Sequence, residues 1–299
     1  MRSVTRPIRL RAPGGRRALL GGLMLLACLA AAGAHAQNAP RRVVCIGGAL
    51  TEIVYALGAA DRLVAVDTTS VFPAAARNLP QVGYQRTLSA EGILAQTPDL
   101  VIATADAGPQ AALRQIRDAG VKVEPVPVGY SPQALDEKVK RVAAALGAQP
   151  QGEALLKQIA QGWRRLHGQI EASGKRPRVL FILAHGGPAL MVAGRDTAAH
   201  AMIELAGGVN VAADTTGYKA LSPEAVAGAA PDVILITDEG IEAVGGRDRL
   251  LAKAGLSQTP AARQGRVVAM NALLLLGFGP RTPEAAEQLA HALAGQAAR

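Results

Sequence analysis

The chain of 299 residues has few aromatic side chains, with three Phe, four Tyr and one Trp. Proteins that bind single-stranded nucleic acids stack bases on aromatic residues that lie among basic ones. The formal net charge of +9 favours that class at first sight, but six arginines in residues 1–36, a segment without acidic residues, supply +6 of it. The rest of the chain carries only +3 (9 − 6), so we expect no nucleic acid partner.

Cysteine and histidine are also scarce. Cys45 lies in the apolar run Val43–Ile46, where a buried and unreactive thiol is expected. The other cysteine, Cys28, lies in the N-terminal segment, and its removal would leave no internal disulfide. The five histidines lack the paired spacing and the cysteine partners of zinc sites, which argues against a bare zinc or manganese site. They are His35, His167, His185, His200 and His291.

Signatures of catalysis are missing as well. His185-Gly186-Gly187 follows a predicted strand, as in the oxyanion turn of some esterases, but the chain has no G-x-S-x-G nucleophile elbow. Gly47-Gly48 follows another predicted strand without completing the dinucleotide-binding pattern G-x-G-x-x-G. We therefore expect no enzymatic activity.

The N-terminal segment has the three parts of an export signal. A basic region ends at Arg17, an apolar run covers 18–32, and Ala34-His35-Ala36 offers small residues to a signal peptidase. The apolar run is shorter than the ~20 residues that span a membrane, so we expect no transmembrane span in the mature chain. We predict a signal peptide at 1–36 with cleavage after Ala36. Lipoprotein anchoring at Cys28 and twin-arginine export through Arg16-Arg17 remain alternatives.

One sequence motif occurs twice in the chain. Leu88-Ser89-Ala90-Glu91 followed by Pro98–Ile102 recurs as Leu221-Ser222-Pro223-Glu224 followed by Pro231–Leu235, an offset of 133 residues (221 − 88). A repeat of this length is typical of one supersecondary unit used twice. Each copy places a glutamate in the first turn of a short helix that precedes a buried strand. The repeat predicts two similar lobes with a cleft between them.

Short apolar strands alternate with helical segments along most of the chain, which indicates parallel sheets. We predict an α/β fold with two Rossmann-like lobes, at 41–146 and 177–299, joined by one long connecting helix at 147–174. The apolar residues of the connecting region recur at helical spacing, interrupted at 147–152. Strands are predicted at 42–46, 63–67, 100–104, 121–125, 179–183 and 267–270, and helices from Thr51 onward and at 110–119, 198–206 and 283–298.

Tyr84 and Arg86 lie on an extended segment just before the first repeat helix, at the expected mouth of the cleft. A tyrosinate is a hard oxygen donor that suits ferric iron, and it is an axial ligand in some haem proteins. A free phenol titrates near pH ~10, so it needs a neighbouring cation to ionise at neutral pH. Arg86 can supply that charge and can also reach a ligand carboxylate. A loop tyrosine packed on its neighbour is the alternative that the residues alone leave open.

The succession of signal, α/β lobe, connecting helix and α/β lobe resembles the helix-linked periplasmic binding proteins of ABC importers, the class that carries vitamin B12 and siderophores. Three segments look like the haem-binding branch of that family: Gly83–Gly92, Ala184–Gly187 and Leu274–Arg281. The resemblance covers nearly all of the mature chain. It implies a periplasmic protein that captures ferric haem b as a transported ligand and delivers it to the permease and ATPase of an inner-membrane importer.

The resemblance also implies roles for single residues. Tyr84 would be the axial ligand of the haem iron, and Arg86 would support the phenolate or a haem propionate. A second arginine would come from the opposite lobe, for which Arg247 and Arg249 both remain open. His185 matches a position that contacts iron or a second haem in some relatives, and a capped loop histidine is the alternative.

Three further residues take roles from the resemblance. Tyr218 lies opposite Tyr84 in the repeat, one residue out of register, and is expected to line the cleft. Glu91 and Glu224 match the two glutamates that dock onto arginines of the permease, while their place in the first turn of a helix also suits the helix dipole.

Two alternatives to haem transport remain. One is a siderophore or corrinoid carrier on the same fold, and the other is an exported α/β enzyme. For a carrier of either kind, a helical connector predicts only a small closure when the ligand binds.

Overall fold

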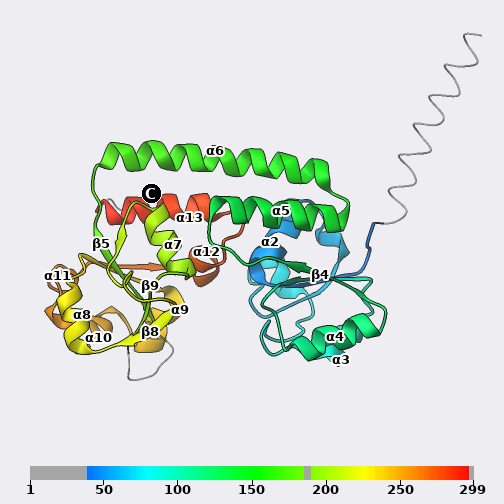
Figure 1. Cartoon of the computed structure of the whole chain (residues 1–299), viewed down its shortest axis with the longest axis horizontal. Coiled ribbons are helices and arrows are strands. Elements are labelled where there is room, and N and C mark those ends of the chain that lie inside the picture. Colours follow the sequence, from blue (N-terminus) through cyan, green and yellow to red (C-terminus); the bar gives the residue numbers. More distant parts are fainter. Residues whose placement is uncertain (1–38, 185–189, 296–299) are drawn as a thin grey trace, which may run out of the picture. The chain divides into compact units, whose positions relative to one another are not determined.

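The computed structural model describes residues 39–184 and 190–295 (Figure 1). The first lobe is built on a four-stranded parallel sheet with the strand order β2-β1-β3-β4. All four residues of β1 are buried, because helices cover both faces of the sheet. Val43 and Cys45 enter the core on one face, and Val44 and Ile46 enter the core on the other. The strands are β1 Val43–Ile46, β2 Leu63–Val66, β3 Leu100–Thr104 and β4 Lys122–Val126.

Two helices of this lobe, α3 and α5, begin after a serine whose hydroxyl accepts from an N–H of the first turn. Ser131 caps α5, and its hydroxyl accepts a hydrogen bond from the Ala134 N–H at 3.1 Å. The α-helices are α2 Gly48–Ala56, α3 Ala90–Leu94, α4 Gln110–Asp118 and α5 Pro132–Leu146, and the 3₁₀ turns are η1 Ala60–Arg62 and η2 Ala74–Asn78.

The second lobe has a six-stranded mixed sheet with the order β10-β9-β5-β6-β8, in which β7 pairs with β5. The pairings of β9 with β10 and β5 are parallel, as predicted, and the unpredicted β7 is also parallel to β5. In contrast, β6 and β8 run antiparallel to their neighbours. The six residues 184–189 that join β5 to β6 are too few for the crossover that parallel neighbours require. The strands are β5 Arg178–Leu183, β6 Leu190–Ala193, β7 Val209–Asn210, β8 Tyr218–Leu221, β9 Val233–Thr237 and β10 Val267–Met270.

Helices flank this sheet as well, and cores lie on both of its faces. Its helical elements are α7 Ala198–Leu205, α8 Pro223–Ala229, α9 Asp238–Val244, α10 Arg247–Leu251, η3 Leu256–Gln258, α11 Pro260–Arg263, α12 Ala272–Leu276 and α13 Thr282–Leu293. The last helix therefore ends five residues before the predicted position 298 (298 − 293).

Helix α6, Gln149–Ser173, lies between the two lobes in the chain and packs on α5 of the first and α13 of the second. Gly147 ends α5 in the left-handed conformation, so the break predicted at 147–152 is confined to two residues. Trp163 contacts the cores of both lobes. Within the described parts of the chain, no helix is long and apolar enough to cross a membrane.

The sequence repeat is also a structural repeat. In each copy a serine caps the short helix, a glutamate lies in its first turn, and a buried strand follows. In each copy an arginine at or just before the start of the neighbouring strand donates its backbone N–H to the aspartate of the repeat, and its guanidinium donates to carbonyls at or just after the end of the helix. The equivalent sets are Arg42 with Gln96, Thr97 and Asp99, and Arg178 with Ala229, Ala230 and Asp232.

Candidate ligand-binding cleft

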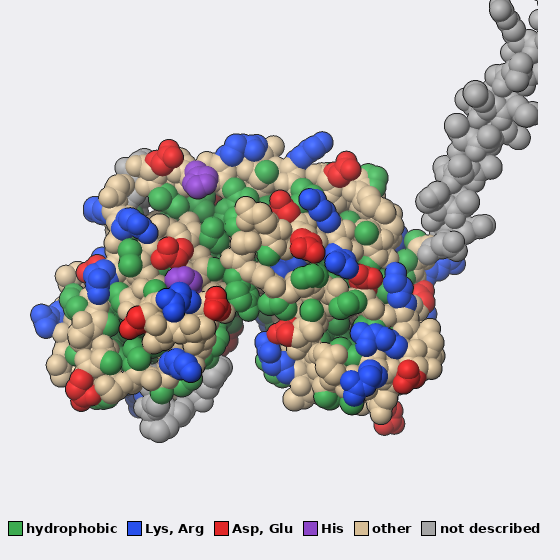
Figure 2. All heavy atoms as spheres, in the orientation of Figure 1, with side chains coloured by type: hydrophobic (Ala, Val, Ile, Leu, Met, Phe, Trp, Pro, Cys, Tyr) green, Lys and Arg blue, Asp and Glu red, His purple; other side chains and the backbone are tan. Residues whose placement is uncertain are grey.

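A cavity of about 470 Å³ lies between the lobes, at the carboxyl ends of the strands of the first sheet. In the order β2-β1-β3-β4, the strand that follows β1 in the chain lies on one side of it and the later strands lie on the other side. Ligands of open α/β sheets bind at such a switch point, here between β1 and β3. Gly47 and Gly48 follow β1, and Thr104 and Asp106 come from the end of β3; all four line the cavity. Figure 2 shows the molecular surface hollowed between the two lobes.

The glycine turn after β1 brings the lobes close together. Gly47 has φ 120°, and its N–H donates to the Asp67 carboxylate at 2.9 Å, while the Gly48 N–H donates to the Thr69 hydroxyl at 2.9 Å. These acceptors satisfy the first N–H groups of α2, which therefore begins at Gly48, three residues earlier than predicted (51 − 48). A β-carbon at Gly48 would meet the Thr69 carbonyl and Leu273 of the second lobe.

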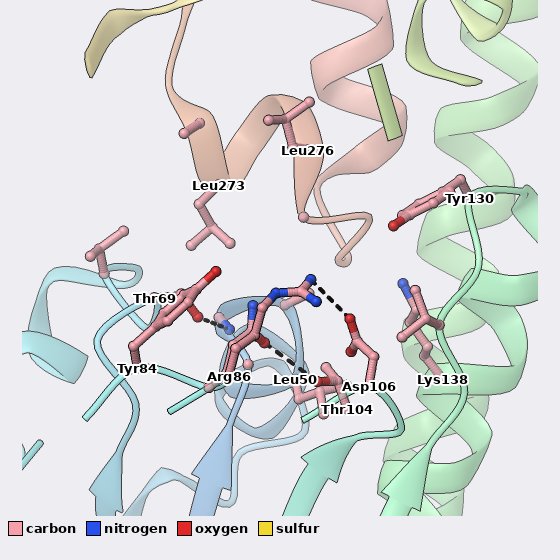
Figure 3. Close-up of a pocket in the computed structure, with 18 of the residues that line it drawn as sticks. Leu50, Thr69, Tyr84, Arg86, Thr104, Asp106, Tyr130, Lys138, Leu273 and Leu276 are labelled. Atoms are coloured by element: carbon pink, nitrogen blue, oxygen red, sulfur yellow. Dashed lines mark hydrogen bonds and ion pairs between the residues drawn. The ribbon is translucent and has the colours of Figure 1, made fainter. Parts of the chain in front are cut away.

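The wall from the first lobe carries most of the polar side chains of the cavity, set among apolar residues such as Leu50 and Val71. Tyr84, on the segment between β2 and α3, is 43% exposed and lines the cavity beside Arg86 (Figure 3). The Arg86 guanidinium forms an ion pair with the Asp106 carboxylate at 2.9 Å. The pKa of Arg86 is raised, mainly by hydrogen bonding with Tyr84 and further by the Asp106 charge, with partial burial opposing the shift. Arg86 thus stays cationic beside the phenol.

Two more polar residues of this wall were not predicted from the sequence. Tyr130 follows β4, and its ring packs edge-on against Phe278 of the second lobe with centroids 5.3 Å apart. Burial raises the pKa of Tyr130, Asp106 adds to the shift, and Arg86 opposes it. A tyrosine just past the carboxyl end of a predicted parallel strand is a recognisable signal for this position.

Lys138 on α5 is the other unpredicted residue. It is 5% exposed, lines the cavity, and donates from its ammonium to the Phe278 carbonyl at 3.2 Å. Burial lowers the pKa of Lys138 to about 8, while the Asp106 charge acts in the opposite direction. The sequence could have indicated this position, because Lys138 lies at helical spacing from the apolar residues Leu135 and Val142 and therefore on the buried face of the helix.

The wall from the second lobe is mostly apolar. Leu273 and Leu276 of α12 line the cavity (Figure 3), and Ala272 and Gly277 complete this wall. Asn271 caps this short helix by accepting from the Leu274 N–H at 3.1 Å. Glu239 of α9 is the charged group that this lobe contributes to the lining.

A buried ion pair joins the lobes beside the cavity. The guanidinium of Arg281 donates to both carboxylate oxygens of Glu52 on α2, at 2.7 and 2.9 Å, and Glu52 is 5% exposed. The same guanidinium lies 3.5 Å from the centroid of the Phe72 ring. Burial raises the pKa of Glu52, and Arg281 opposes the shift. The segment Leu274–Arg281, which carried part of the family resemblance, therefore contributes a contact between the lobes.

Among the described residues, Tyr218, Arg247 and Arg249 were also predicted for the site but are not in the lining of the cavity. Tyr218 begins β8 and is 38% exposed. Burial raises the pKa of Tyr218, Tyr130 adds to the shift, and Arg86 opposes it. Since Tyr130 and Arg86 line the cavity, Tyr218 lies within electrostatic reach of the cleft. Arg247 donates to the Val267 carbonyl, and neither it nor Arg249 is among the lining residues. His185 lies outside the described residues.

Glu91 and Glu224 are exposed and lie in the first turns of the equivalent helices α3 and α8. The pKa of Glu224 is lowered by a hydrogen bond to its own backbone and by Ser222. Both positions therefore hold accessible carboxylates.

The described part of the chain contains no cluster of three or more His, Cys, Asp or Glu residues that could hold a bare metal ion. The cavity instead combines two phenol groups, two cations, two carboxylates and an apolar wall. Such a lining suits an amphipathic ligand with anionic substituents and an atom that a phenolate oxygen can bind.

A family model described as "Periplasmic binding protein" matches residues 43–273. The chain belongs to this family. Among solved structures, the periplasmic heme-binding protein BhuT in complex with two hemes is 47% identical, with a TM-score of 0.82 over 85% of this chain and 98% of that chain. The apo form of the periplasmic heme-binding protein RhuT from Roseiflexus sp. RS-1 is 43% identical, with a TM-score of 0.83 and the same coverage of 85% and 98%.

Curated relatives include the Vitamin B12-binding protein of Vibrio cholerae, which is 30% identical over 254 residues, 83% of this chain and 87% of the relative. The predicted membership in the helix-linked periplasmic binding proteins, on the side of the haem-binding branch, is confirmed by these similarities. The family and these relatives are binding proteins and not enzymes, in agreement with the expected lack of catalytic activity.

Proposed function

We propose that this periplasmic binding protein captures ferric haem b in the cleft and delivers it to an inner-membrane ABC importer, with the Tyr84 phenolate as the iron ligand. The observation that carries the proposal is Tyr84 itself: a partly exposed phenol that lines the cavity, with the Arg86 cation beside it and Leu273 on the facing wall. A phenolate is a good ligand for ferric iron, and an apolar wall accepts the face of a porphyrin. The structural relatives BhuT and RhuT, both named as heme-binding, support the same ligand.

Arg86 would stabilise the phenolate and reach one haem propionate. Its present partner is Asp106, at 2.9 Å, so a propionate would have to share or replace this ion pair. Tyr218 of the second lobe would contact the ligand from the opposite side of the cleft, within reach of Tyr130 and Arg86. Arg247 and Arg249 would need to leave their present positions on α10 to contact a propionate.

Export would follow cleavage after Ala36 and place the mature protein in the periplasm, as the family name implies. Glu91 and Glu224 would pair with arginines on the permease, because they are exposed, equivalent in the two lobes and free to contact a partner surface. Such ion pairs at the rim of an interface set its orientation more than its strength.

A corrinoid carrier is the second candidate, since Vitamin B12-binding proteins are among the relatives. The axial positions of the cobalt in cyanocobalamin are already occupied, whereas those of ferric haem are open, so a corrinoid would not need an ionisable tyrosine at the position of Tyr84. The two functions therefore differ in their dependence on one hydroxyl group.

The test is a visible absorption titration of the exported, purified protein with ferric haem and, separately, with cyanocobalamin. We expect a saturable Soret shift with high-spin tyrosinate bands in the wild type. Tyr84→Phe should lose those bands, and Tyr218→Phe, the matched control from the second lobe, should keep them. A protein that binds cyanocobalamin and not haem would establish the corrinoid function, and unchanged bands in Tyr84→Phe would disprove the ligand assignment.

A further inference from the structure

We infer that Lys138 recognises a carboxylate of the ligand inside the cleft, an inference that rests on the proposed function of the cavity as a ligand site. The ammonium of Lys138 lies at the cavity lining and the residue is 5% exposed. A charge at this depth requires a partner, because removing it from water is costly unless an opposite charge or hydrogen bonds compensate.

The partners that the structure provides are incomplete. An ammonium has three N–H donors, and among the described residues Lys138 makes one side-chain hydrogen bond, to the Phe278 carbonyl at 3.2 Å. No carboxylate of the described chain lies within 4.0 Å of the ammonium. Asp106 acts on Lys138 only at longer range and is engaged by Arg86 at 2.9 Å. The buried cation thus lacks a direct counter-charge on the side of the cavity.

The lining around Lys138 indicates which kind of anion would supply that charge. Leu273 and Leu276 form the facing apolar wall, so the body of the ligand is apolar, and the anion is a substituent at its edge. Asp106 and Glu239 also line the cavity and would repel a ligand with several charges at one point. A single carboxylate matches one ammonium and leaves Arg86 for a second one.

The lowered pKa of Lys138 agrees with this role. Burial favours the neutral amine, and a ligand carboxylate beside it would favour the ammonium again. A lysine kept for structure alone would more simply be an apolar residue, like its core neighbours Leu135 and Val142 on α5.

The test compares ferric haem with its dimethyl ester, in which both carboxylates are blocked and the iron is unchanged. In the wild-type protein we expect haem to bind about 10-fold or more tightly than the ester. Lys138→Met should reduce this ratio by about 10-fold. Lys140→Met, which removes an exposed lysine from the same helix, should leave the ratio unchanged. Thermal unfolding of each variant verifies its fold.

Lys138→Gln provides a second test that does not depend on Lys138→Met folding, because its amide can still donate to the Phe278 carbonyl while the charge is removed. The ratio of haem to ester affinity should fall in Lys138→Gln as it does in Lys138→Met. A ratio equal to that of the wild type in either folded variant would overturn the inference. A wild type that binds neither compound would instead overturn the proposed function.

Discussion

The two lobes share an internal repeat but present different surfaces to the cleft. Ser89 and Ser222 cap equivalent helices, and Asp99 and Asp232 accept equivalent backbone hydrogen bonds. The loops at the carboxyl ends of the strands have diverged: the first lobe supplies Tyr84, Arg86, Asp106, Tyr130 and Lys138, and the second supplies α12 with its leucines. The repeated parts maintain the fold of each lobe, and the diverged parts give the cleft one polar and one apolar wall.

The largest expected effect concerns the outer faces, where the lobes are alike. Changing Glu91 and Glu224 together to Ala should abolish uptake of the ligand by cells, because both contacts with the permease would be lost, and should leave haem titrations unchanged. Each single variant should reduce uptake by a similar factor if the lobes dock equivalently. Normal uptake by the double variant would refute the docking role.

The ion pair between the lobes should have the next largest effect. Arg281→Met leaves the Glu52 carboxylate buried without its partner, and breaking such a pair costs about 3–5 kcal/mol of unfolding free energy. Urea denaturation measures the loss. The double variant with Glu52→Gln should be less destabilised than the sum of the single changes, because no uncompensated charge remains. Additive losses would show that the two side chains act independently.

Lys138→Met should stabilise the fold on the order of 2 kcal/mol at pH 7, after the lost hydrogen bond to Phe278 is counted. The pKa is about 8 in the folded protein and 10.5 in the unfolded chain, so the unfolded chain holds more protons between these values. The unfolding free energy of the wild type therefore rises as the pH increases from about 8 to 10.5. The stability difference between Lys138→Met and the wild type should shrink over the same range. Denaturant unfolding at pH 7 and pH 10 measures both, and an advantage independent of pH would contradict the assignment.

The smallest effects should come from the repeated caps. Ser89→Ala and Ser222→Ala each remove one hydrogen bond to a helix N–H, and each should lower the unfolding free energy by about 1 kcal/mol. Equal losses of unfolding free energy, measured by urea denaturation, would show that the two caps are energetically equivalent. If only one of the two variants lost stability, the two caps would be equivalent in sequence but not in their contribution to the unfolding free energy.

Local sequence patterns predicted the fold well because burial follows them closely. Strands β3 and β10 have the predicted bounds, and Tyr84 and Arg86 line the cavity that the repeat implied. Antiparallel β6 and β8 were not foreseen, since their pairing depends on the short connection after β5. Lys138 was missed because it lies on the otherwise apolar face of α5, and its place at the cavity depends on a contact with Phe278, 140 residues away in the sequence.

Helix α6 and the Glu52–Arg281 pair both attach the lobes to each other, and Trp163 packs into both cores. With these attachments, we expect the separation of Glu91 and Glu224 to change little when a ligand enters. A transporter that binds both carboxylates would therefore bind the ligand-free and the ligand-bound protein with similar affinity. Empty carriers would compete for the same transporters, so the import rate should depend on the fraction of carrier that is loaded as well as on the ligand supply.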